Sequence, residues 1–544
     1  MRAYAVLRHV SLTLGLFLAA CSGEDVAPST VQPVATVGAA GASTPPAGSV
    51  GVAGAAGLPS AAPAAARPLD MTASTTPPTA AGAASPQPSA APPTAGASAG
   101  APPAAGAGGA AAPVAEAGSG GTPAPAPSTG PLFPAPGATN VCADVTLRLR
   151  LPSAPSLGTS GKISVFSSRG GNAVAVVDMA AAQVRETVGG TALTLPRPVH
   201  VSEREVIVRL PRRLDYGQEY YVTVDASAIK PAMELTDPSK WRFTTRAAAP
   251  ADPSKLRVAL DGSGDFCSVQ GALDAVPARS KSEISIGEGT YFEAVHVSGK
   301  ANVTLRGGDR KRTRIVGTNN ENLNSGTAKR ALVSFDNSQN IVIENLTIHN
   351  LTPQGGSQAE ALRLDKCDQC VVRRADILSL QDTLLWTGRV YAKDCYIEGN
   401  VDFVWGYGAA YFDHCEIKTV GRTGYVVQAR NGAGASGYVF VDSKITADPG
   451  ISKIVLARID AAEYPASQVA YVNCQMGSHI APEGWTVTGG GGGSLRFWEY
   501  QSTNESGAPL DVSRRHAASK QISADQAATL RDPAKVLGGW APPP

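Results

Sequence analysis

Two aspartates in the second half of the chain occupy equivalent places in a repeating pattern, and together they could carry out acid–base or nucleophilic chemistry. Asp382 follows Gln381, and Asp402 lies in the phrase formed by residues 399–406. Two carboxyl groups held close together cannot both ionise easily, so the pKa of one rises while the other stays low. Such a pair supplies a protonated acid beside an ionised nucleophile or base.

The elements that must position this pair are short strand-like phrases that recur through residues 254–544. Each phrase ends in an apolar residue, and these residues are Ile348, Ile377, Ile397, Ile417, Ile445 and Met476. Their spacings are 29, 20, 20, 28 and 31 residues, a 20-residue minimum with insertions. One strand per repeat with few helical stretches predicts an all-β fold, a right-handed parallel β-helix whose inward side chains stack from rung to rung.

The phase of the two aspartates within this repeat predicts that they are neighbours. Asp382 follows Ile377 by five residues, and Asp402 follows Ile397 by five residues. Adjacent rungs lie about 4.8 Å apart, so the two carboxylates would stack on one face. The alternative is that both are turn aspartates that only accept hydrogen bonds from backbone amides.

The same phase stacks Cys395 against Cys415, either as a disulfide or as a ladder of core side chains. Eight cysteines are present, and seven remain if Cys21 is modified, so at least one is unpaired. No Cys/His spacing is typical of a zinc site, and the Cys367-x-x-Cys370 motif is interpreted as structural. We therefore expect no metal and no cofactor.

The N-terminus, residues 1–21, has the composition of an export signal. Arg2 and Arg8 precede a short apolar run, and Leu18-Ala19-Ala20-Cys21 resembles a bacterial lipobox. The resemblance implies cleavage before Cys21, lipidation of that cysteine and, with Ser22 following it, a place at the outer membrane or cell surface. The alternative is an ordinary secretory signal with an incidental cysteine.

Two further segments separate this signal from the repeats. Residues 22–138 are mostly Ala, Pro, Gly, Ser and Thr, which predicts a disordered linker because such a composition cannot bury enough apolar surface. Residues 139–247 contain short alternating strands, which predict an antiparallel sandwich resembling bacterial immunoglobulin-like modules. We interpret this sandwich as a spacer, with carbohydrate binding as the alternative. The net charge of +2 offers no concentrated basic face, so we expect no nucleic-acid partner.

Several ordered phrases along residues 255–544 resemble the pectinesterase (pectin methylesterase) family. The phrases are Asp261-Gly262-Ser263-Gly264-Asp265-Phe266, Gly289-Thr290-Tyr291-Phe292-Glu293, Gln358-Ala359-Glu360-Ala361-Leu362, Gln381-Asp382-Thr383-Leu384, Gly399-Asn400-Val401-Asp402-Phe403-Val404-Trp405-Gly406 and Met476-Gly477-Ser478-His479-Ile480-Ala481-Pro482-Glu483-Gly484-Trp485. The resemblance implies hydrolysis of methyl esters in pectin by a monomeric enzyme. The phrases are far more specific together than any one of them alone.

The resemblance also assigns roles to individual residues. Asp402 would be the nucleophile, and Asp382 would be the acid that protonates departing methanol and then the base that activates water. Gln358 and Gln381 would donate hydrogen bonds to the developing oxyanion. Arg458 matches the arginine that holds the nucleophilic carboxylate ionised and oriented.

The chain departs from the family pattern beside Arg458. Family members usually carry Gly-Arg-Pro-Trp, whereas this chain has Ala457-Arg458-Ile459-Asp460 and lacks the tryptophan that stacks on sugar. Candidates to replace this contact are Tyr291, Trp386, Trp405, Trp485 and Trp498, with core packing as the alternative for each. Arg430, in a phrase that also matches the family, could meet a galacturonate carboxylate.

Other functions would require different motifs in the sequence. A polygalacturonase would carry an adjacent Asp-Asp pair and Gly-His-Gly, and neither string occurs. A pectate lyase would need an acidic calcium cluster, and none is evident. The remaining alternatives are an outer-membrane acyl-thioesterase of the same fold and a non-catalytic glycan-binding surface protein. Cys142 and Cys267 could join the sandwich to the first turn of the repeats.

Overall fold

The structure is a computed structural model that describes residues 130–421, 424–490 and 493–543. The predicted signal with Cys21 and the predicted linker as far as residue 129 lie outside the described residues. Within them, no helix is both long enough and apolar enough to cross a membrane.

The first described domain is a β-sandwich with its own core. One sheet has the order β1 (Leu132–Phe133), β3 (Thr146–Arg150), β10 (Glu205–Arg209) and β9 (Val199–Ser202), and the other has the order β2 (Ala138–Val141), β13 (Arg242–Thr245), β11 (Glu219–Val224), β5 (Lys162–Ser167) and β6 (Ala175–Asp178). A small ladder pairs β12 (Ile229–Lys230) with β4 (Ser156–Leu157). Alternate residues of these strands are buried around Trp241, whose indole N–H donates to the carbonyl oxygen of Pro134.

The sandwich begins earlier than the sequence predicts. Strand β1 pairs with β3 in antiparallel register, although its residues fall in the segment expected to be linker. Leu132 and Phe133 are buried against the sandwich core, and Arg148 stacks over the Phe133 ring at 4.3 Å. These two large apolar side chains interrupt the Ala/Pro/Gly composition, and their burial is the reason that the linker ends before residue 138.

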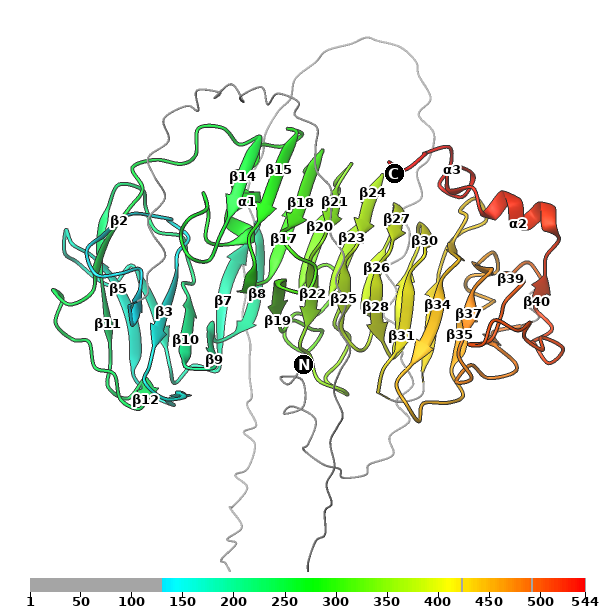
Figure 1. The fold of residues 1–544 in the computed structure, drawn as a ribbon, viewed down its shortest axis with the longest axis horizontal. Helices are drawn as coiled ribbons and strands as arrows, with labels where there is room; N and C mark the ends of the chain where they lie inside the picture. The colour runs from blue at the N-terminus through cyan, green and yellow to red at the C-terminus, as the bar shows by residue number, and fades with distance from the viewer. Residues whose placement is uncertain (1–129, 422–423, 491–492, 544) are drawn as a thin grey trace, which may run out of the picture. The chain divides into compact units, whose positions relative to one another are not determined.

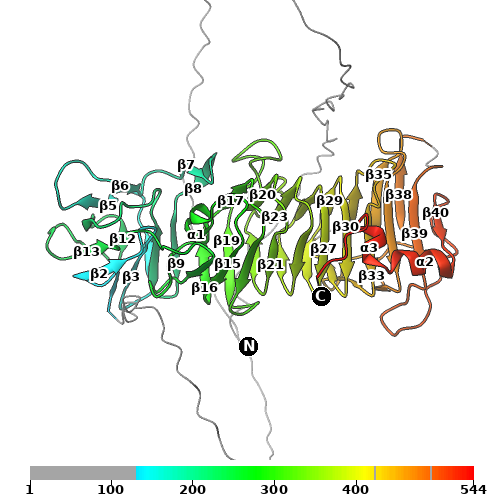
Figure 2. The same cartoon turned by 90° about the horizontal axis from the view of Figure 1, so that it is seen from above.

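The second domain consists of three parallel sheets wound as a β-helix (Figures 1 and 2). The first sheet contains β14 (Lys255–Val258), β15 (Ser282–Ile286), β18 (Val303–Gly307), β21 (Val342–Glu344), β24 (Cys370–Arg373), β27 (Arg389–Lys393), β30 (Ala409–Asp413), β33 (Tyr438–Val441), β36 (Gln468–Val472), β39 (Arg496–Tyr500) and β40 (Ser519–Gln521). The second sheet contains β16 (Gly289–Phe292), β19 (Thr313–Gly317), β22 (Thr347–Asn350), β25 (Asp376–Leu378), β28 (Tyr396–Gly399), β31 (Glu416–Thr419), β34 (Lys444–Ala447) and β37 (Gln475–Met476). The third, called the site sheet below, contains β17 (Val295–Ser298), β20 (Val333–Asp336), β23 (Leu362–Asp365), β26 (Leu384–Trp386), β29 (Val401–Gly406), β32 (Tyr425–Ala429), β35 (Val455–Asp460) and β38 (Trp485–Thr488).

The strand register confirms the repeat found in the sequence. Along the second sheet, the aligned residues are Ile348, Ile377, Ile397, Ile417, Ile445 and Met476, in that order. Every spacing of the repeat, including those with insertions, is therefore one full turn of the β-helix.

Interior side chains stack from turn to turn, and aromatic rings form one of the ladders. Phe412 stacks on Trp386 at 5.4 Å and on Phe440 at 4.4 Å, and Phe440 stacks on Tyr471 at 4.7 Å. On the outer face of the first sheet, α2 (Ala524–Leu530) and α3 (Pro533–Val536) cover a smaller apolar cluster (Figure 2).

The cysteines of the β-helix correct one expectation. Cys395 and Cys415 are buried and free, so they belong to a ladder of core thiols and do not form a disulfide. Cys474 is a third free and buried thiol of this kind, placed two residues before Met476. Cysteines on adjacent turns have the same spacing in the sequence whether they stack as free thiols or form a disulfide. The spacing alone therefore could not distinguish the two arrangements.

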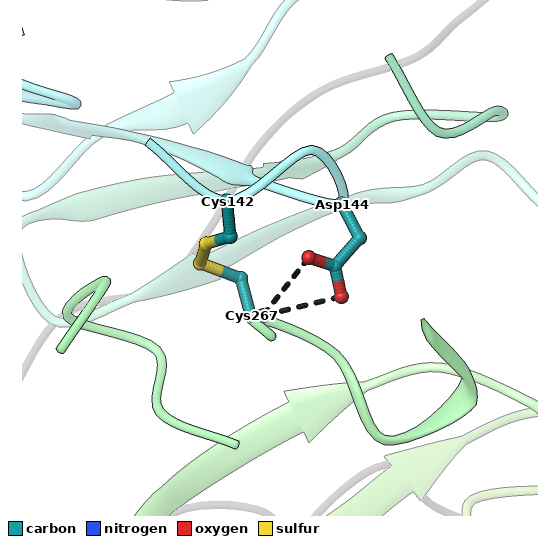
Figure 3. A group of neighbouring side chains, drawn as sticks. All are labelled: Cys142, Asp144 and Cys267. Atoms are coloured by element: carbon teal, nitrogen blue, oxygen red, sulfur yellow. Dashed lines mark hydrogen bonds between the residues drawn. A yellow bond between two sulfur atoms is a disulfide. The ribbon is translucent and has the colours of Figure 1, made fainter. Parts of the chain in front are cut away.

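A disulfide between Cys142 and Cys267 joins the sandwich to the start of the β-helix, as expected (Figure 3). Beside it, the Asp144 carboxylate accepts hydrogen bonds from the backbone N–H groups of Cys267 and Ser268, and from the Ser268 hydroxyl at 2.6 Å. Although these side chains offer three potential metal-ligand atoms close together, the sulfurs are bonded to each other and the carboxylate is already hydrogen-bonded. The cluster is therefore a joint between domains.

Two more elements contact the first turn of the β-helix. Helix α1 (Val269–Ala275) begins directly after the disulfide, and Ser268 is its N-cap. The hairpin of β7 (Gln183–Val188) and β8 (Thr191–Pro196) departs from the sandwich sheets. Its residues Val188, Leu193 and Leu195 are buried in the same apolar core as the β-helix strands. A polar contact adds to this packing, because the Thr194 N–H donates to the Asn324 side-chain oxygen at 2.8 Å.

Replacing both Cys142 and Cys267 by serine is expected to lower the free energy of unfolding by about 2–4 kcal/mol, because a cross-link of long separation restricts the unfolded chain most. The matched control is the double replacement of Cys367 and Cys370, which are equally buried but are bonded across a separation of 3 residues instead of 125. Urea unfolding under oxidising conditions measures the free energy of unfolding of both variants. Equal losses in the two variants would show that local packing, and not loop closure, dominates.

Candidate active site

The site sheet places the two aspartates on neighbouring strands. Leu384 of β26 pairs with Val404 of β29, so Asp382 and Asp402, each two residues earlier, lie opposite one another. The Asp382 N–H donates to the carbonyl oxygen of Val401 at 3.1 Å, which fixes the local register. Adjacent strands are about 4.8 Å apart, so the predicted stacking of the two side chains is confirmed.

Both aspartates occupy an uncommon backbone conformation. The φ angle is +63° at Asp382 and +50° at Asp402, in the left-handed region that aspartate tolerates better than most residues. At Asp402 the pairing of β29 with β32 also shifts register between Val401 and Val404, which is a bulge. Bulges redirect side chains next to active sites, and here the conformation turns both carboxyl groups onto one surface.

Arg458 of β35 reaches across β32 to Asp402. Its Nε donates to Oδ1 and Oδ2 of Asp402 at 2.8 Å and 3.0 Å, and its Nη2 donates to Oδ2 as well. The guanidinium lies 4.8 Å from the centre of the Tyr425 ring, which supports its flat face. A planar, permanently charged group bound in this way fixes the orientation of the Asp402 carboxyl group and places a positive charge beside it.

Asp382 has different surroundings. Burial raises its pKa well above the ordinary aspartate value, and the negative charges of Glu360 and Asp402 raise it further. The positive charges of Arg330 and Arg430 oppose this effect without cancelling it. Asp382 is therefore protonated at a pH where an exposed aspartate is ionised. The two stacked carboxyl groups differ in the way that an acid and a nucleophile must.

Gln358 and Gln381 lie at the edges of this pair. Gln381 directly precedes Asp382, and its carbonyl oxygen accepts the Ala359 N–H at 3.1 Å, which aligns the two glutamines on adjacent turns. Both side chains are partly exposed, and among the described residues neither side-chain amide donates a hydrogen bond. Their N–H groups are available to a ligand, as an oxyanion site requires.

Sequence reasoning missed two charged residues beside Asp382, Arg330 and Glu360, and a third, Glu321, that is connected to it through Arg330. Arg330 donates from Nη2 to Oδ2 of Asp382 at 3.0 Å, and it also pairs with Glu360 and Glu321. Glu360 lies inside a phrase that resembles the family, two residues after Gln358. Arg330 precedes β20 with no motif of its own, so only the fold could place it near Asp382.

Three of the aromatic residues expected to bind sugar are core residues instead. Tyr291, Trp386 and Trp485 are each 1% exposed. The Tyr291 hydroxyl donates to the carbonyl oxygen of Gly287, and the Trp485 indole N–H donates to Glu499. These rings fill the interior of the β-helix, because strand residues alternate between the two faces, and the period-two pattern does not reveal which face is inside.

Trp405 and Arg430 do lie at the site. The Arg430 guanidinium is 5.2 Å from the Trp405 ring centre, and its Nη1 donates to the Tyr407 hydroxyl at 3.2 Å. Tyr464 contacts both of these partners, since its ring packs edge-on against Tyr407 and lies 5.7 Å from the guanidinium. Tyr407 is 45% exposed and is one of few exposed large aromatic or aliphatic side chains in the described chain. Tyrosines thus surround the arginines where the family's Pro-Trp is missing.

Comparison with known proteins identifies the families of both domains. The Pectinesterase family profile matches residues 255–537, and the profile described as Bacterial Ig-like domain matches residues 124–245. "Pectinesterase 31" of Arabidopsis thaliana is 32% identical over 263 residues, covering 45% of this chain and 81% of the relative. "Probable pectinesterase A" of Neosartorya fischeri is 29% identical, covering 52% of this chain and 86% of the relative.

Solved structures with similar folds include "Pectin methylesterase from Carrot", with 27% identity and a TM-score of 0.48. This match covers 54% of the present chain and 95% of the carrot chain. "Pectin methylesterase from Yersinia enterocolitica" has 26% identity and a TM-score of 0.44, covering 51% and 100% of the two chains.

A parallel β-helix that presents an arginine-bound carboxylate beside a second carboxyl group, with amide donors next to both, has the groups that a carboxylic ester hydrolase needs. The profile match spans more than half of the chain. The chain belongs to the pectinesterase family, and it carries a bacterial Ig-like domain before its catalytic β-helix.

Proposed function

We propose that the chain removes methyl esters from the galacturonate units of pectin, with Asp402 as nucleophile and Asp382 as acid and then base. The observation that carries this proposal is the unequal environment of the two stacked carboxyl groups. Arg458 binds Asp402 through Nε and Nη2, whereas burial and neighbouring negative charge raise the pKa of Asp382. The similarity to named pectinesterases supplies the substrate class.

In the first half-reaction, a carboxylate oxygen of Asp402 attacks the ester carbonyl carbon. The carbonyl oxygen becomes an oxyanion, and the amide N–H groups of Gln358 and Gln381 stabilise it. As the intermediate collapses, the bond to the methoxy oxygen breaks and Asp382 gives that oxygen its proton. Methanol leaves, and the galacturonate acyl group stays on Asp402 as an anhydride.

In the second half-reaction, Asp382 is ionised because it has lost its proton. It takes a proton from a water molecule, whose oxygen attacks the acyl carbonyl carbon. The bond to Asp402 breaks, releasing the galacturonate carboxyl group as the acid, which then gives its proton to solvent. Asp402 is again ionised and Asp382 is again protonated, so the site returns to its starting state.

Arg430 with its tyrosines is the proposed recognition element for the sugar chain. Its guanidinium lies close to the Trp405 and Tyr464 rings, and the residue is partly exposed. A free galacturonate carboxylate could pair with the charge, and the exposed Tyr407 ring offers an apolar face to a pyranose. This arrangement would replace the stacking tryptophan that the phrase around Arg458 lacks.

We propose further that the enzyme acts outside the cytoplasm, attached through a lipid on Cys21. The support is the lipobox-like phrase at the end of the apolar run in residues 1–21. Metabolic labelling with a radioactive fatty acid tests this, since the intact chain should incorporate label and Cys21→Ser should not. Equal label in both proteins would contradict the anchor.

The substrate assignment is tested by methanol release. The purified protein is expected to liberate methanol from methyl-esterified pectin, and no methanol from the same pectin after saponification. Long-chain acyl-thioesters, assayed in parallel through the released thiol, should be hydrolysed no faster than in buffer. Thioester turnover without methanol release would identify the acyl-thioesterase, and binding of pectin without either reaction would identify a glycan-binding protein.

A further inference from the structure

Arg330 is an unusual neighbour for an acid. Its guanidinium donates to Oδ2 of Asp382 at 3.0 Å, and its side chain is only 8% exposed. A buried cation at this distance favours the ionised form of a carboxyl group. Alone, it would remove the proton that Asp382 needs in the first half-reaction.

Glu360 compensates this charge. Its carboxylate is fully buried and accepts from Nε of Arg330 at 3.0 Å and from Nη2 at 2.7 Å. Glu321 accepts from the remaining Nη1 at 3.0 Å, at a more exposed position. Carboxyl groups thus contact the guanidinium on three sides. Glu360 and Glu321 compensate its positive charge, so Arg330 faces Asp382 as a hydrogen-bond donor whose charge is already balanced.

The contact also distinguishes the two oxygens of Asp382. Oδ2 accepts the hydrogen bond from Arg330, and Oδ1 lies outside this hydrogen bond. One oxygen is fixed to the protein while the other is left for proton transfer.

We propose that the Glu360–Arg330 pair is a positioning device that holds Asp382 in place while keeping it protonated for the departure of methanol. This inference rests on the proposed function, in which Asp382 is the acid. Six charged groups surround Asp382 directly or through one partner, namely Arg330, Glu360, Glu321, Asp402 with its bound Arg458, and Arg430. Within this set, Glu360 contributes the largest charge effect that raises the pKa of Asp382, after burial itself.

The test is the pH profile of kcat/KM for Glu360→Gln. The alkaline limb of this profile reports loss of the proton from Asp382 in the free enzyme. Removing the negative charge should move that limb to lower pH by about 1–3 pH units and leave the acidic limb in place. Adding Arg330→Gln to the variant removes the uncompensated cation, so the alkaline limb should return toward its wild-type position.

Glu344→Gln is the matched control. Glu344 is equally buried and pairs with Arg306, Arg373 and Arg374 on the first sheet. It should lose thermal stability without any change in the pH profile. If Glu360→Gln lowers stability or the height of the profile but leaves the alkaline limb unchanged, Glu360 is merely structural and the proposal is overturned.

The two levels of inference can fail separately. If Asp382→Asn keeps wild-type turnover, the acid assignment itself is wrong, whatever Glu360→Gln does. If Asp382→Asn is inactive but the limb of Glu360→Gln does not move, the acid assignment stands and only the role of the Glu360–Arg330 pair is refuted.

Discussion

Asp402→Asn is expected to lower kcat on pectin by on the order of 10⁴-fold or more, because removal of a nucleophile leaves only the contributions of binding and oxyanion stabilisation. Asparagine has nearly the same shape, and its side-chain oxygen can still accept a hydrogen bond from Arg458. The loss would therefore come from chemistry and not from collapse of the site. Methanol release over long incubations measures the residual rate.

A second buried aspartate provides the matched control for this variant. Asp376 lies in β25 of the second sheet, is 3% exposed and pairs with Arg310 and Lys311. Asp376→Asn should reduce thermal stability and leave kcat within a few-fold of wild type. Should Asp402→Asn retain more than about a hundredth of the wild-type rate, the nucleophile must be sought elsewhere.

Asp382→Asn is expected to have two opposite effects. Turnover should fall by about 10²–10⁴-fold, the usual contribution of a general acid–base group. Thermal stability at neutral pH should rise, because the folded protein no longer buries a carboxyl group in an environment that disfavours its charge. A catalytic group held in unfavourable surroundings often shows this exchange of stability for activity.

The pH dependence of the stability difference follows from linkage. The pKa of Asp382 is higher in the folded protein than the ordinary value of 3.8. Its contribution to the free energy of unfolding is therefore complete below that value and is lost as the pH rises through the folded pKa. Asparagine does not titrate, so the gap in melting temperature between variant and wild type should widen from pH 4 to pH 8. A gap that narrows over this range would contradict the raised pKa.

The turns of the β-helix could be predicted from sequence because its strands repeat a simple apolar phase. Insertions lengthen the spacing between aligned residues from 20 to as many as 31 residues without changing the phase. Each inserted segment forms a loop between two strands of the β-helix. The same phase predicted the opposition of Asp382 and Asp402. Residues whose proximity depends on the register of adjacent strands can therefore be predicted from a single sequence.

Contacts between residues on non-adjacent turns of the β-helix could not be predicted from this repeat. Arg330 meets Asp382 across 52 residues, and nothing in the phrase before β20 indicates a charge at the site. The sequence also does not show which side of a strand is exposed. It therefore left sugar binding and core packing both open for Tyr291, Trp386 and Trp485, which are interior. Both failures concern the direction of side chains in three dimensions, which depends on packing and not on local pattern.

The β7–β8 hairpin has a consequence for the boundaries of the enzyme. A solenoid has two open ends whose apolar interior must be shielded, usually by a terminal capping element. Here Val188, Leu193 and Leu195 contribute to that interior, although they lie more than fifty residues before the start of the family match at residue 255. The hairpin of the Ig-like module therefore serves as an end cap for the β-helix, so the apolar core of the enzyme extends beyond the segment that the family match covers.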